Sequence, residues 1–453
     1  MRGKVILVAN RLPIKIVEQA GAVVLERSIG GVATALDAVA QTYNPLWVGW
    51  TGLAKHLPAA TLQSLLPPNL VPVQAGAALV TQYYDHIANQ VLWPVLHEYA
   101  PTHRATSTDW KGYHEIAGRF AEAIARVVQP GDVIWSHDFH LLLLPAALRA
   151  QGITNKVGHF LHTPFPPAEY LLPLDHCAEL LASLAQVDVL GLQTQRDVEN
   201  FHSLVRLSKG RLPPRVGAFP IGIDYHAYRH AGMQPDVQRF AATYKREAAG
   251  KRIILSISRR DYTKGILNQL RAVERLLATT RQPEQFVYRL VVAPSRENVR
   301  ANAQLQHDIE TTVAGINQRW SRAGWQPVEY SYENLSFAQM TAWYLCAEIM
   351  LLAPMLDGMN LIAKEYVATR QAEPGVLVLS EAAGAAAQLR DALLINPTDI
   401  DATANALMQA TAMAPAEKTK RWHRLQQVVQ TEDVYHWADA FITAVRKQSR
   451  QPS

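Results

Sequence analysis

Apolar residues gather in short runs that recur between longer stretches of helical periodicity. The runs do not alternate with polar positions, which is typical of strands buried on both faces of a parallel sheet. They comprise residues 5–8, 132–135, 156–161, 187–190, 253–256, 288–292, 349–352 and 376–379. Between them lie amphipathic segments such as residues 108–128, a predicted helix whose start Ser107, Thr108 or Asp109 could cap. Strands that alternate with helices indicate an α/β fold built from βαβ units.

The series of strands and helices is interrupted once. A stretch rich in Pro, Gly and Arg covers residues 210–217, and a second series begins at Arg252. We therefore predict two doubly wound domains of similar size, facing each other across a cleft. In such folds, ligands bind beyond the carboxyl ends of the strands.

Composition narrows the class of protein. Of 453 residues, 44 are Lys or Arg and 39 are Asp or Glu, so the net charge is 44 − 39 = +5. The basic residues are scattered, which argues against a nucleic-acid binder. No apolar run approaches the roughly 18 residues of a membrane span, and the first run is too short for a signal peptide. Two cysteines form no disulfide framework, so we expect a cytoplasmic protein.

Two polar segments follow predicted strands in the second half of the chain. Residues 258–265 bring three cations together, which suits a diphosphate, although a solvated loop has the same composition. Residues 354–365 form a turn and then a predicted helix carrying Glu365. The start of this helix could hold phosphate and its carboxylate a ribose diol, or the Glu could lie on the surface. Gly30-Gly31 suits either an anion site or a plain helix-entry turn.

Candidate chemistry in the first half is less specific. His137, Asp138 and His140 end one predicted strand and invite a metal interpretation, but sugar binding by polar strand ends is the better hypothesis. No G-x-S-x-G motif supports a serine hydrolase. Arg11 and Arg296 each follow a strand and could clamp one phosphate, or be unrelated surface residues.

Taken together, the segments resemble the trehalose-6-phosphate synthase family of retaining glycosyltransferases, collinearly from about residue 4 to 445. The similarity is carried by motifs in the same order along both chains. They are Ala9-Asn10-Arg11-Leu12-Pro13, Gly30-Gly31, Trp47-Val48-Gly49-Trp50-Thr51-Gly52, Val91-Leu92-Trp93-Pro94, Ser136-His137-Asp138-Phe139-His140-Leu141, Phe160-Leu161-His162-Thr163-Pro164-Phe165-Pro166, Pro220-Ile221-Gly222-Ile223, Arg259, Asp261-Tyr262-Thr263-Lys264-Gly265, Asp357-Gly358-Met359-Asn360-Leu361 and Ala363-Lys364-Glu365-Tyr366.

The resemblance implies a fold and a reaction. It implies two facing Rossmann-like domains of GT-B type with the active site in the cleft. We expect an acceptor-binding domain over residues 1–235, a nucleotide-sugar domain over 236–432, and a C-terminal helix in 433–453 packing back on the first domain. The implied reaction moves glucose with retention from a nucleotide-glucose, usually UDP-glucose in this family, to glucose 6-phosphate. No metal or other cofactor, nucleic acid or membrane is expected, but a homo-oligomer is, with trehalose-6-phosphate phosphatase acting next.

The same resemblance implies roles for individual residues. For catalysis these are Arg259, Lys264, His162 and Asp357. For the donor they are Gly30, Gly31, Arg259, Lys264, Leu335, Leu361, Ile362, Ala363, Lys364 and Glu365. For the acceptor they are Arg11, Tyr84, Asp138 and Arg296, and for anomer selectivity Trp93 and Thr163.

Four positions depart from the family pattern, and two other functions stay open. Ala117 replaces an Asn that is common after the Trp-x-Gly-Tyr segment. Leu356 stands where the family has an Arg, while Ser258 and Arg260 replace a carboxylate and an apolar residue. These changes leave the nucleotide base and the acceptor undecided. One alternative is a glucosylglycerol-phosphate synthase, which would use glycerol 3-phosphate. The other is a non-catalytic regulatory homologue, against which the joint presence of the donor residues argues.

Overall fold

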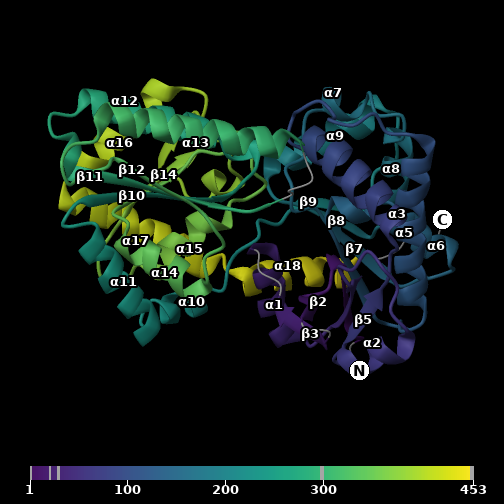
Figure 1. Ribbon diagram of the computed structural model, residues 1–453. Coiled ribbons are helices and arrows are strands. Elements are labelled where there is room, and N and C mark those ends of the chain that lie inside the picture. The colour runs from purple at the N-terminus through teal and green to yellow at the C-terminus, as the bar shows by residue number, and fades with distance from the viewer. Residues whose placement is uncertain (1–2, 20–21, 28–30, 296–299, 449–453) are drawn as a thin grey trace. The chain divides into compact units, whose positions relative to one another are not determined.

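The computed structural model describes residues 3–19, 22–27, 31–295 and 300–448 (Figure 1). The chain forms two compact units. Unit 1 comprises Met1–Ile221 with Val434–Ser453, and unit 2 comprises Gly222–Asp433. Gly30 and Arg296, both predicted as site residues, lie outside the described residues.

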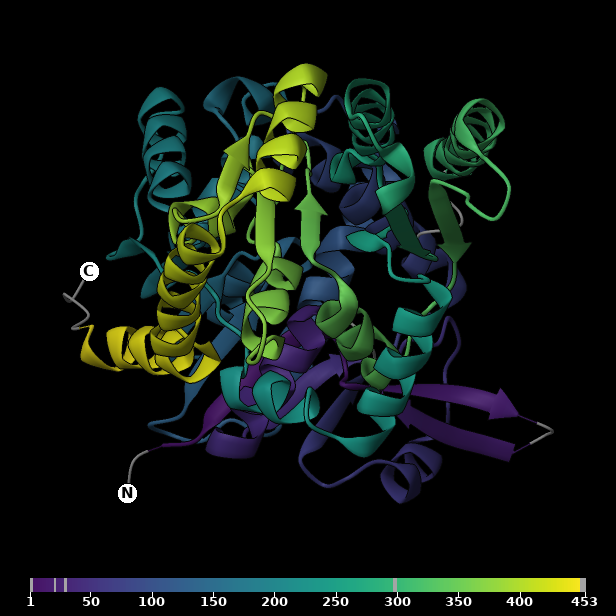
Figure 2. The ribbon, with the colours of Figure 1, turned by 90° about the vertical axis from the view of Figure 1, so that its left-hand side faces the viewer.

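Unit 1 is built on a seven-stranded parallel sheet. Its strand order is β5 (Leu70–Val73), β4 (Leu46–Trp50), β1 (Val5–Arg11), β6 (Val133–His137), β7 (Lys156–Phe160), β8 (Val189–Leu192) and β9 (Val216–Ala218). The order steps outward from β1 in both directions, as in a doubly wound sheet. A separate antiparallel hairpin, β2 (Ile14–Gln19) and β3 (Ala22–Arg27), is the purple two-stranded ribbon at the right of Figure 2.

Helices cover both faces of the unit 1 sheet (Figure 1). One layer contains α1 (Gly31–Tyr43) and the C-terminal helix α18 (Val434–Lys447), which packs on β6, β7 and β8. Gly158 and Gly191 permit this close packing, since a Cβ atom at either position would come within 2.7 Å or less of the Phe441 ring. The other layer contains α5 (Ser107–Ala125), α6 (Leu144–Ala150) and α8 (Cys177–Leu184). The remaining helices of unit 1 are α2 (Ala59–Leu65), α3 (Ala77–Val80), the π-helix η1 (Thr81–Leu92), α4 (Trp93–Leu96), η2 (Phe139–Leu141), α7 (Ala168–Leu171) and α9 (Gln195–Leu207).

Unit 2 contains a six-stranded parallel sheet. Its strand order is β12 (Val328–Tyr332), β11 (Phe286–Ala293), β10 (Arg252–Arg259), β13 (Ile349–Leu352), β14 (Val376–Ser380) and β15 (Leu393–Ile395). Numbered within the unit, this is the 3-2-1-4-5-6 order of Rossmann folds. In Figure 1, α12 (Ile266–Thr279), α13 (Arg300–Trp320) and α16 (Ile400–Ala412) cover one face. The other face carries α10 (Tyr225–Ala231), α11 (Pro235–Glu247), α14 (Phe337–Cys346), α15 (Leu361–Thr369) and α17 (Pro415–Thr431).

The fold confirms the predicted α/β class and the eight predicted strands, with two local corrections. The helix predicted over 108–128 is α5, and its N-cap is Thr106, one residue before the predicted caps. Thr106 is the N-cap because it forms a capping box with Asp109. Its hydroxyl accepts from the Asp109 amide, and the Asp109 carboxylate accepts from the Thr106 amide, so two otherwise unpaired donors are satisfied. The predicted boundary at residue 235 falls inside unit 2, because α10 packs on α15.

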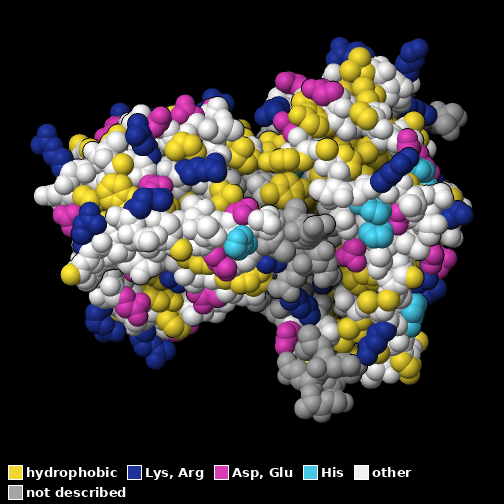
Figure 3. Space-filling view, turned by 45° about the horizontal axis from the view of Figure 1, so that its top comes forward, with side chains coloured by type: hydrophobic (Ala, Val, Ile, Leu, Met, Phe, Trp, Pro, Cys, Tyr) yellow, Lys and Arg dark blue, Asp and Glu magenta, His cyan; other side chains and the backbone are white. Residues whose placement is uncertain are grey.

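The sheets hold the apolar core of each unit. In unit 2, for example, Leu290, Val292, Ile349 and Leu351 are buried together. No helix among the described residues is long and apolar enough to cross a membrane. On the face shown in Figure 3, Lys, Arg, Asp and Glu side chains are interspersed rather than gathered by sign, in keeping with the scattered basic residues of the sequence.

Candidate active site

In unit 1, Arg11 ends the central strand β1 and lies against two aromatic rings. Its guanidinium carbon is 4.7 Å from the centroid of Trp50 and 5.3 Å from that of Tyr84. The Trp47 indole donates a hydrogen bond to the Arg11 carbonyl at 3.2 Å. Gly49 allows β4 to approach here, since a Cβ atom would lie 2.6 Å from the Arg11 backbone. The cation is therefore held by its neighbours in a defined place at the carboxyl end of the sheet.

Tyr84 comes from η1, a helix of π type that the sequence pattern did not predict. Its ring stacks on His140 at 5.7 Å and packs on Trp50 at the same distance. Long π-helical segments are rare and often accompany functional sites. The η1 segment thus brings a phenol hydroxyl to the same aromatic group as Arg11.

Asp138 occupies a strained turn directly after β6. Its φ angle is 72°, in the left-handed region that costs a non-glycine residue free energy. The turn lets the Asp138 amide donate to the Phe160 carbonyl at 2.7 Å, while its carboxylate accepts from the His162 amide at 3.2 Å. The ends of β6 and β7 are joined in this way, and Asp138 and His162 become neighbours.

His162 also contacts a second histidine, His137. Nδ1 of His137 lies 3.1 Å from Nε2 of His162, and both rings are buried. Burial lowers the pKa of His162 to about 3, with a further contribution from His159, and it lowers the pKa of His137 well below its ordinary value. Both imidazoles are therefore neutral at physiological pH. Their hydrogen bond then requires that one ring carries its single proton on the nitrogen that faces the other ring.

The two residues predicted for anomer selectivity are buried in unit 1. Trp93 begins α4 and packs on the rings of His97 and Phe139. Thr163 follows His162, and its hydroxyl has no hydrogen-bond partner among the described residues. A buried unpaired hydroxyl costs free energy, which is a feature of sites that await a ligand.

In unit 2, the polar segment after β10 forms a tight 3-10 turn, η3 (Tyr262–Lys264). The turn ends at Gly265, whose φ is 63° and where a Cβ atom would lie 2.2 Å from the Ala353 carbonyl oxygen. Only glycine fits there. The turn directs the Lys264 ammonium onto the Asp357 carboxylate at 2.6 Å, and these side chains are 11% and 17% exposed. Arg259, the last residue of β10, is exposed.

The second polar segment of unit 2 leads into α15. Asn360 precedes the helix with a φ of 74°, and its amide lies 3.3 Å from the Asp357 carboxylate. Asp357 therefore accepts from both Lys264 and Asn360, which ties the two polar segments together. Leu361, Ile362 and Ala363 form the first turn of α15, and a helix N-terminus favours an anion, although the Ala363 amide already donates to the Asn360 carbonyl at 3.3 Å.

Lys364 and Glu365 are buried on α15. The Tyr344 hydroxyl donates to Glu365 at 2.7 Å, and Tyr228 provides a second hydroxyl. Burial raises the pKa of Glu365, while these two hydroxyls lower it. The Lys364 ammonium donates to the Gln388 amide oxygen at 2.7 Å, and burial lowers the pKa of Lys364 to about 7. Tyr344, Tyr228 and Gln388 were missed at the sequence level because nothing in their spacing links them to α15.

The departures from the family pattern in unit 2 become interpretable. Leu356, which replaces a cation, is buried at 8% exposure. The added cation, Arg260, is also buried, with its guanidinium carbon 5.2 Å from the Tyr332 ring centroid. Leu335, predicted for the base pocket, lies half-buried in the loop between β12 and α14. The charge added at residue 260 is thus held against an aromatic ring.

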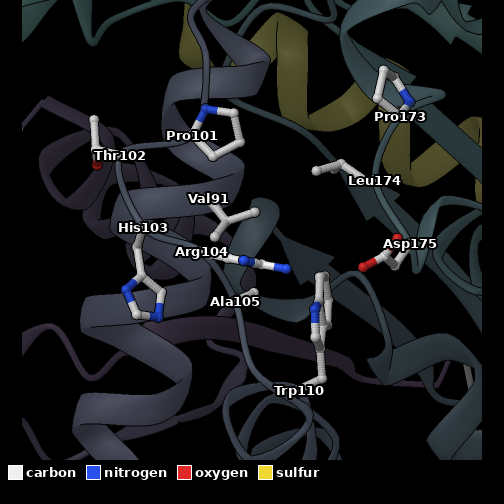
Figure 4. A pocket seen from close by; sticks show the side chains of 10 residues that line it. All are labelled: Val91, Pro101, Thr102, His103, Arg104, Ala105, Trp110, Pro173, Leu174 and Asp175. Atoms are coloured by element: carbon white, nitrogen blue, oxygen red, sulfur yellow. The ribbon is translucent and has the colours of Figure 1, made fainter.

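The groups with metal-ligand spacing and the pocket of unit 1 lie away from the predicted site residues. Among the described residues, the groups with metal-ligand spacing are His86, His103 and Asp109, and His114, His176 and Glu179. Neither includes the His137, Asp138 and His140 group. A pocket of about 390 Å³ in unit 1 contains none of the predicted site residues (Figure 4). It is lined by Val91, Pro101, Thr102, His103, Arg104, Ala105, Trp110, Pro173, Leu174 and Asp175.

Comparison with known proteins decides the family. The model of glycosyltransferase family 20 matches residues 3–447. The chain belongs to glycosyltransferase family 20. Among curated relatives of this family 20 chain, a trehalose-6-phosphate synthase of Mycolicibacterium gilvum is 35% identical, over 99% of this chain and 94% of the relative. A bifunctional trehalose-6-phosphate synthase/phosphatase of Thermoproteus tenax is 35% identical over 97% of this chain, which spans only 63% of that relative.

Solved structures give the same answer for the fold of this family 20 glycosyltransferase. A trehalose-6-phosphate protein from E. coli bound with UDP-2-fluoro glucose matches with a TM-score of 0.89 and 29% identity, covering 99% of this chain and 100% of the other. An α,α-trehalose-phosphate synthase (UDP-forming) from Burkholderia xenovorans in complex with glucose 6-phosphate matches with a TM-score of 0.87 and 29% identity, covering 98% and 100%. Similarity at this coverage confirms the two Rossmann-like domains of GT-B type.

Proposed function

We propose that this family 20 glycosyltransferase moves glucose from UDP-glucose to glucose 6-phosphate with retention, giving α,α-trehalose 6-phosphate and UDP. The observation that carries the proposal is in unit 2, where the η3 turn, Asp357 and the first turn of α15 form one connected polar group. Such a group suits a diphosphate leaving group. The relatives bound to a UDP-glucose analogue and to glucose 6-phosphate support the choice of substrates.

On the donor side, Arg259 and Lys264 would neutralise the diphosphate. Negative charge grows on the leaving UDP as its bond to glucose breaks, so cations and helix amides already in place stabilise the transition state more than the ground state. Lys264 is held by Asp357 and therefore needs little reorganisation. Glu365 would accept hydrogen bonds from the ribose hydroxyls, with Tyr344 holding its carboxylate in place. Leu335 would border the base.

On the acceptor side, Arg11 and Tyr84 would bind the phosphate of glucose 6-phosphate, together with Arg296. Aromatic rings cover part of the half-buried Arg11, so the guanidinium–phosphate attraction is stronger than at an open surface. Asp138 would accept from an acceptor hydroxyl, and His162 would contact the transferred glucose. Trp93 and Thr163 would restrict the approach to one anomer.

The surroundings of the carboxylates bear on how the transfer could retain the anomeric configuration. A glycosidase-like double displacement needs a carboxylate free to attack the anomeric carbon. Asp357 is paired with Lys264, and Glu365 is buried with two tyrosine hydroxyls. We therefore favour front-face attack by the acceptor hydroxyl, whose proton passes to the departing donor phosphate.

The wider setting follows from these substrates. The transfer needs no metal ion, since side-chain cations and the amides of α15 take the place of a divalent ion at the diphosphate. Cys177 and Cys346 are both unpaired, which fits the reducing cytoplasm, where nucleotide sugars are made. A trehalose-6-phosphate phosphatase would consume the product, and the expected homo-oligomer stays a prediction.

A donor-by-acceptor activity matrix tests the function. UDP-, GDP- and ADP-glucose are each offered with glucose 6-phosphate, glucose and glycerol 3-phosphate, and the product and its anomeric configuration are identified by NMR. We expect the highest turnover with UDP-glucose and glucose 6-phosphate. Better turnover with glycerol 3-phosphate would refute the acceptor, and no turnover with any pair would favour the non-catalytic alternative.

A further inference from the structure

Within the part of unit 1 that the structure describes, two groups combine two histidines with one carboxylate, and both involve α5. The first group is His86, His103 and Asp109, and the second is His114, His176 and Glu179. In each, the nearest nitrogen and oxygen atoms lie within 4.8 Å of one another. Neither group contains a residue assigned above to glucosyl transfer. Their geometries differ, and the difference decides which could bind an ion.

The first group is a helix cap. The Asp109 carboxylate accepts from the Thr106 amide at 2.8 Å and from the Thr106 hydroxyl at 2.7 Å, so one of its oxygens is already occupied. The rings of His86 and His103 stack with centroids 4.1 Å apart and planes 26° apart. An ion lies near the plane of each imidazole that binds it, and stacked, nearly parallel rings have no such shared point at bonding distance. This group therefore serves the start of α5 rather than a metal.

The second group converges differently. Nε2 of His114 lies 3.2 Å from one Glu179 oxygen, and Nδ1 of His176 lies 2.7 Å from the other. The two rings are nearly perpendicular, at 66°, with centroids 6.3 Å apart. The two rings thus present a nitrogen to the same carboxylate from different directions. Neutral imidazole nitrogens with a carboxylate oxygen are a donor set that Zn²⁺ prefers.

In the second group, the His176 ring is held in one orientation by the neighbouring Trp110. The His176 ring stacks on Trp110 at 4.2 Å and 24°, and Trp110 is buried on α5. His176 is also the N-cap residue of α8, yet its side chain makes no capping hydrogen bond. The ring is thus fixed by packing and directed at Glu179. Figure 4 shows Trp110 beside the pocket in unit 1, with Asp175, the residue before His176, across from it.

We propose that His114, His176 and Glu179 bind one divalent ion of the zinc class at the surface of unit 1. Bond lengths of about 2.0–2.1 Å in a tetrahedral site place two nitrogen ligands about 3.4 Å apart. Their side chains are 43%, 32% and 43% exposed, so the His114 ring and the Glu179 carboxylate can rotate toward the packed His176 ring and close that distance. Water completes the coordination from the exposed side. The ion links the middle of α5 to the first turn of α8.

The test is zinc binding to metal-free protein, measured by titration calorimetry. We expect one Zn²⁺ per chain in the wild type and a dissociation constant at least about tenfold higher in His114→Ala and Glu179→Gln. The matched control is His103→Ala, which removes a histidine of the first group and should leave zinc affinity unchanged. Thermal melts without zinc check that each variant is folded. Both substituted side chains of the second group are exposed, so their melts should match the wild type.

Two further readouts separate this site from unspecific binding. Co²⁺ in a tetrahedral nitrogen and oxygen site absorbs strongly in the visible range, and this absorption should appear in the wild type and in His103→Ala only. Zinc should raise the melting temperature of the same two proteins. Equal zinc binding by all four proteins would overturn the proposal, as would no binding by the wild type. Loss of binding in His103→Ala alone would place the ion in the first group and overturn it equally.

Discussion

The two units use one architecture for different chemistry. In each, a central strand of a parallel sheet ends at an arginine, Arg11 in unit 1 and Arg259 in unit 2, with further candidate residues at neighbouring strand ends. Unit 1 surrounds Arg11 with aromatic rings and adds the buried neutral pair His137 and His162. Unit 2 adds an ion pair and a helix start instead.

This difference fits the substrate that we propose for each unit. A leaving diphosphate gains negative charge during the reaction, so the unit that meets it needs fixed cations and oriented amides. Sugar hydroxyls are uncharged, so neutral imidazoles and a carboxylate can bind them by hydrogen bonds alone. Comparing variants of the two units therefore separates charge stabilisation from substrate positioning.

The largest effect is expected in unit 2. Lys264→Ala removes a cation that Asp357 holds in place, so stabilisation of the leaving diphosphate is lost. We expect kcat to fall about 100- to 1,000-fold, the usual cost of one preorganised electrostatic group. Steady-state kinetics with UDP-glucose and glucose 6-phosphate measure it. Lys420→Ala, an exposed lysine on α17, is the control and should keep wild-type kcat. A Lys264→Ala enzyme with normal turnover would show that Lys264 does not stabilise the leaving diphosphate.

In unit 1, Arg11→Ala should act on the acceptor rather than on the chemical step. The KM for glucose 6-phosphate should rise at least about tenfold, because a charge-assisted contact to its phosphate is lost. The KM for UDP-glucose should change little. Plain glucose is the comparison substrate, since it has no phosphate to lose. If Arg11→Ala impaired glucose and glucose 6-phosphate equally, Arg11 would not bind the phosphate.

The fold and the ends of the strands could be predicted from the local sequence better than the contacts between side chains. The eight apolar runs lie in strands, because a strand buried on both faces must be apolar throughout. Of the fifteen strands among the described residues, seven were not predicted, and in two of these, β4 and β5, Gly49 and Pro72 interrupt the apolar pattern. Pairs such as Lys264 with Asp357 are 93 residues apart, and no periodicity encodes which strand ends become neighbours. The π-helix of Tyr84 has no sequence signature of its own.

A smaller effect concerns pH and belongs to unit 1. Burial lowers the pKa of His159 and of His162 to about 3, whereas an unfolded histidine has a pKa near 6.5. Between these values the unfolded chain binds more protons, so stability is complete above about pH 6.5 and is lost as the pH falls. Each such histidine changes the unfolding equilibrium constant by up to about tenfold per pH unit.

His159→Asn tests this contribution without touching a proposed site residue. Asparagine keeps a polar contact to Ser136, whose hydroxyl lies 2.8 Å from the His159 ring, but it does not titrate. Urea unfolding between pH 5 and 7 should show a shallower loss of stability in the variant, by about one proton. The comparison uses the slope with pH, so an overall destabilisation does not affect it. Identical slopes would mean that His159 binds protons in the folded protein to the same extent as in the unfolded chain, which would contradict the lowered pKa.

The smallest effect is expected from chelation, and it tests both units at once. The proposed donor group of unit 2 consists of side-chain cations and backbone amides, so excess EDTA should leave kcat and the KM for UDP-glucose unchanged. In unit 1, the same EDTA should remove the rise in melting temperature that zinc produces through His114, His176 and Glu179. One sample thus yields two readouts with opposite expectations. Lost activity restored by Mg²⁺ or Mn²⁺ would show that the diphosphate needs an ion, and unit 2 would then lack the advantage ascribed to its preorganised charges. Unchanged activity together with a lost thermal shift would show that metal binding is not required for glucosyl transfer, as expected if the two occur on separate parts of the chain.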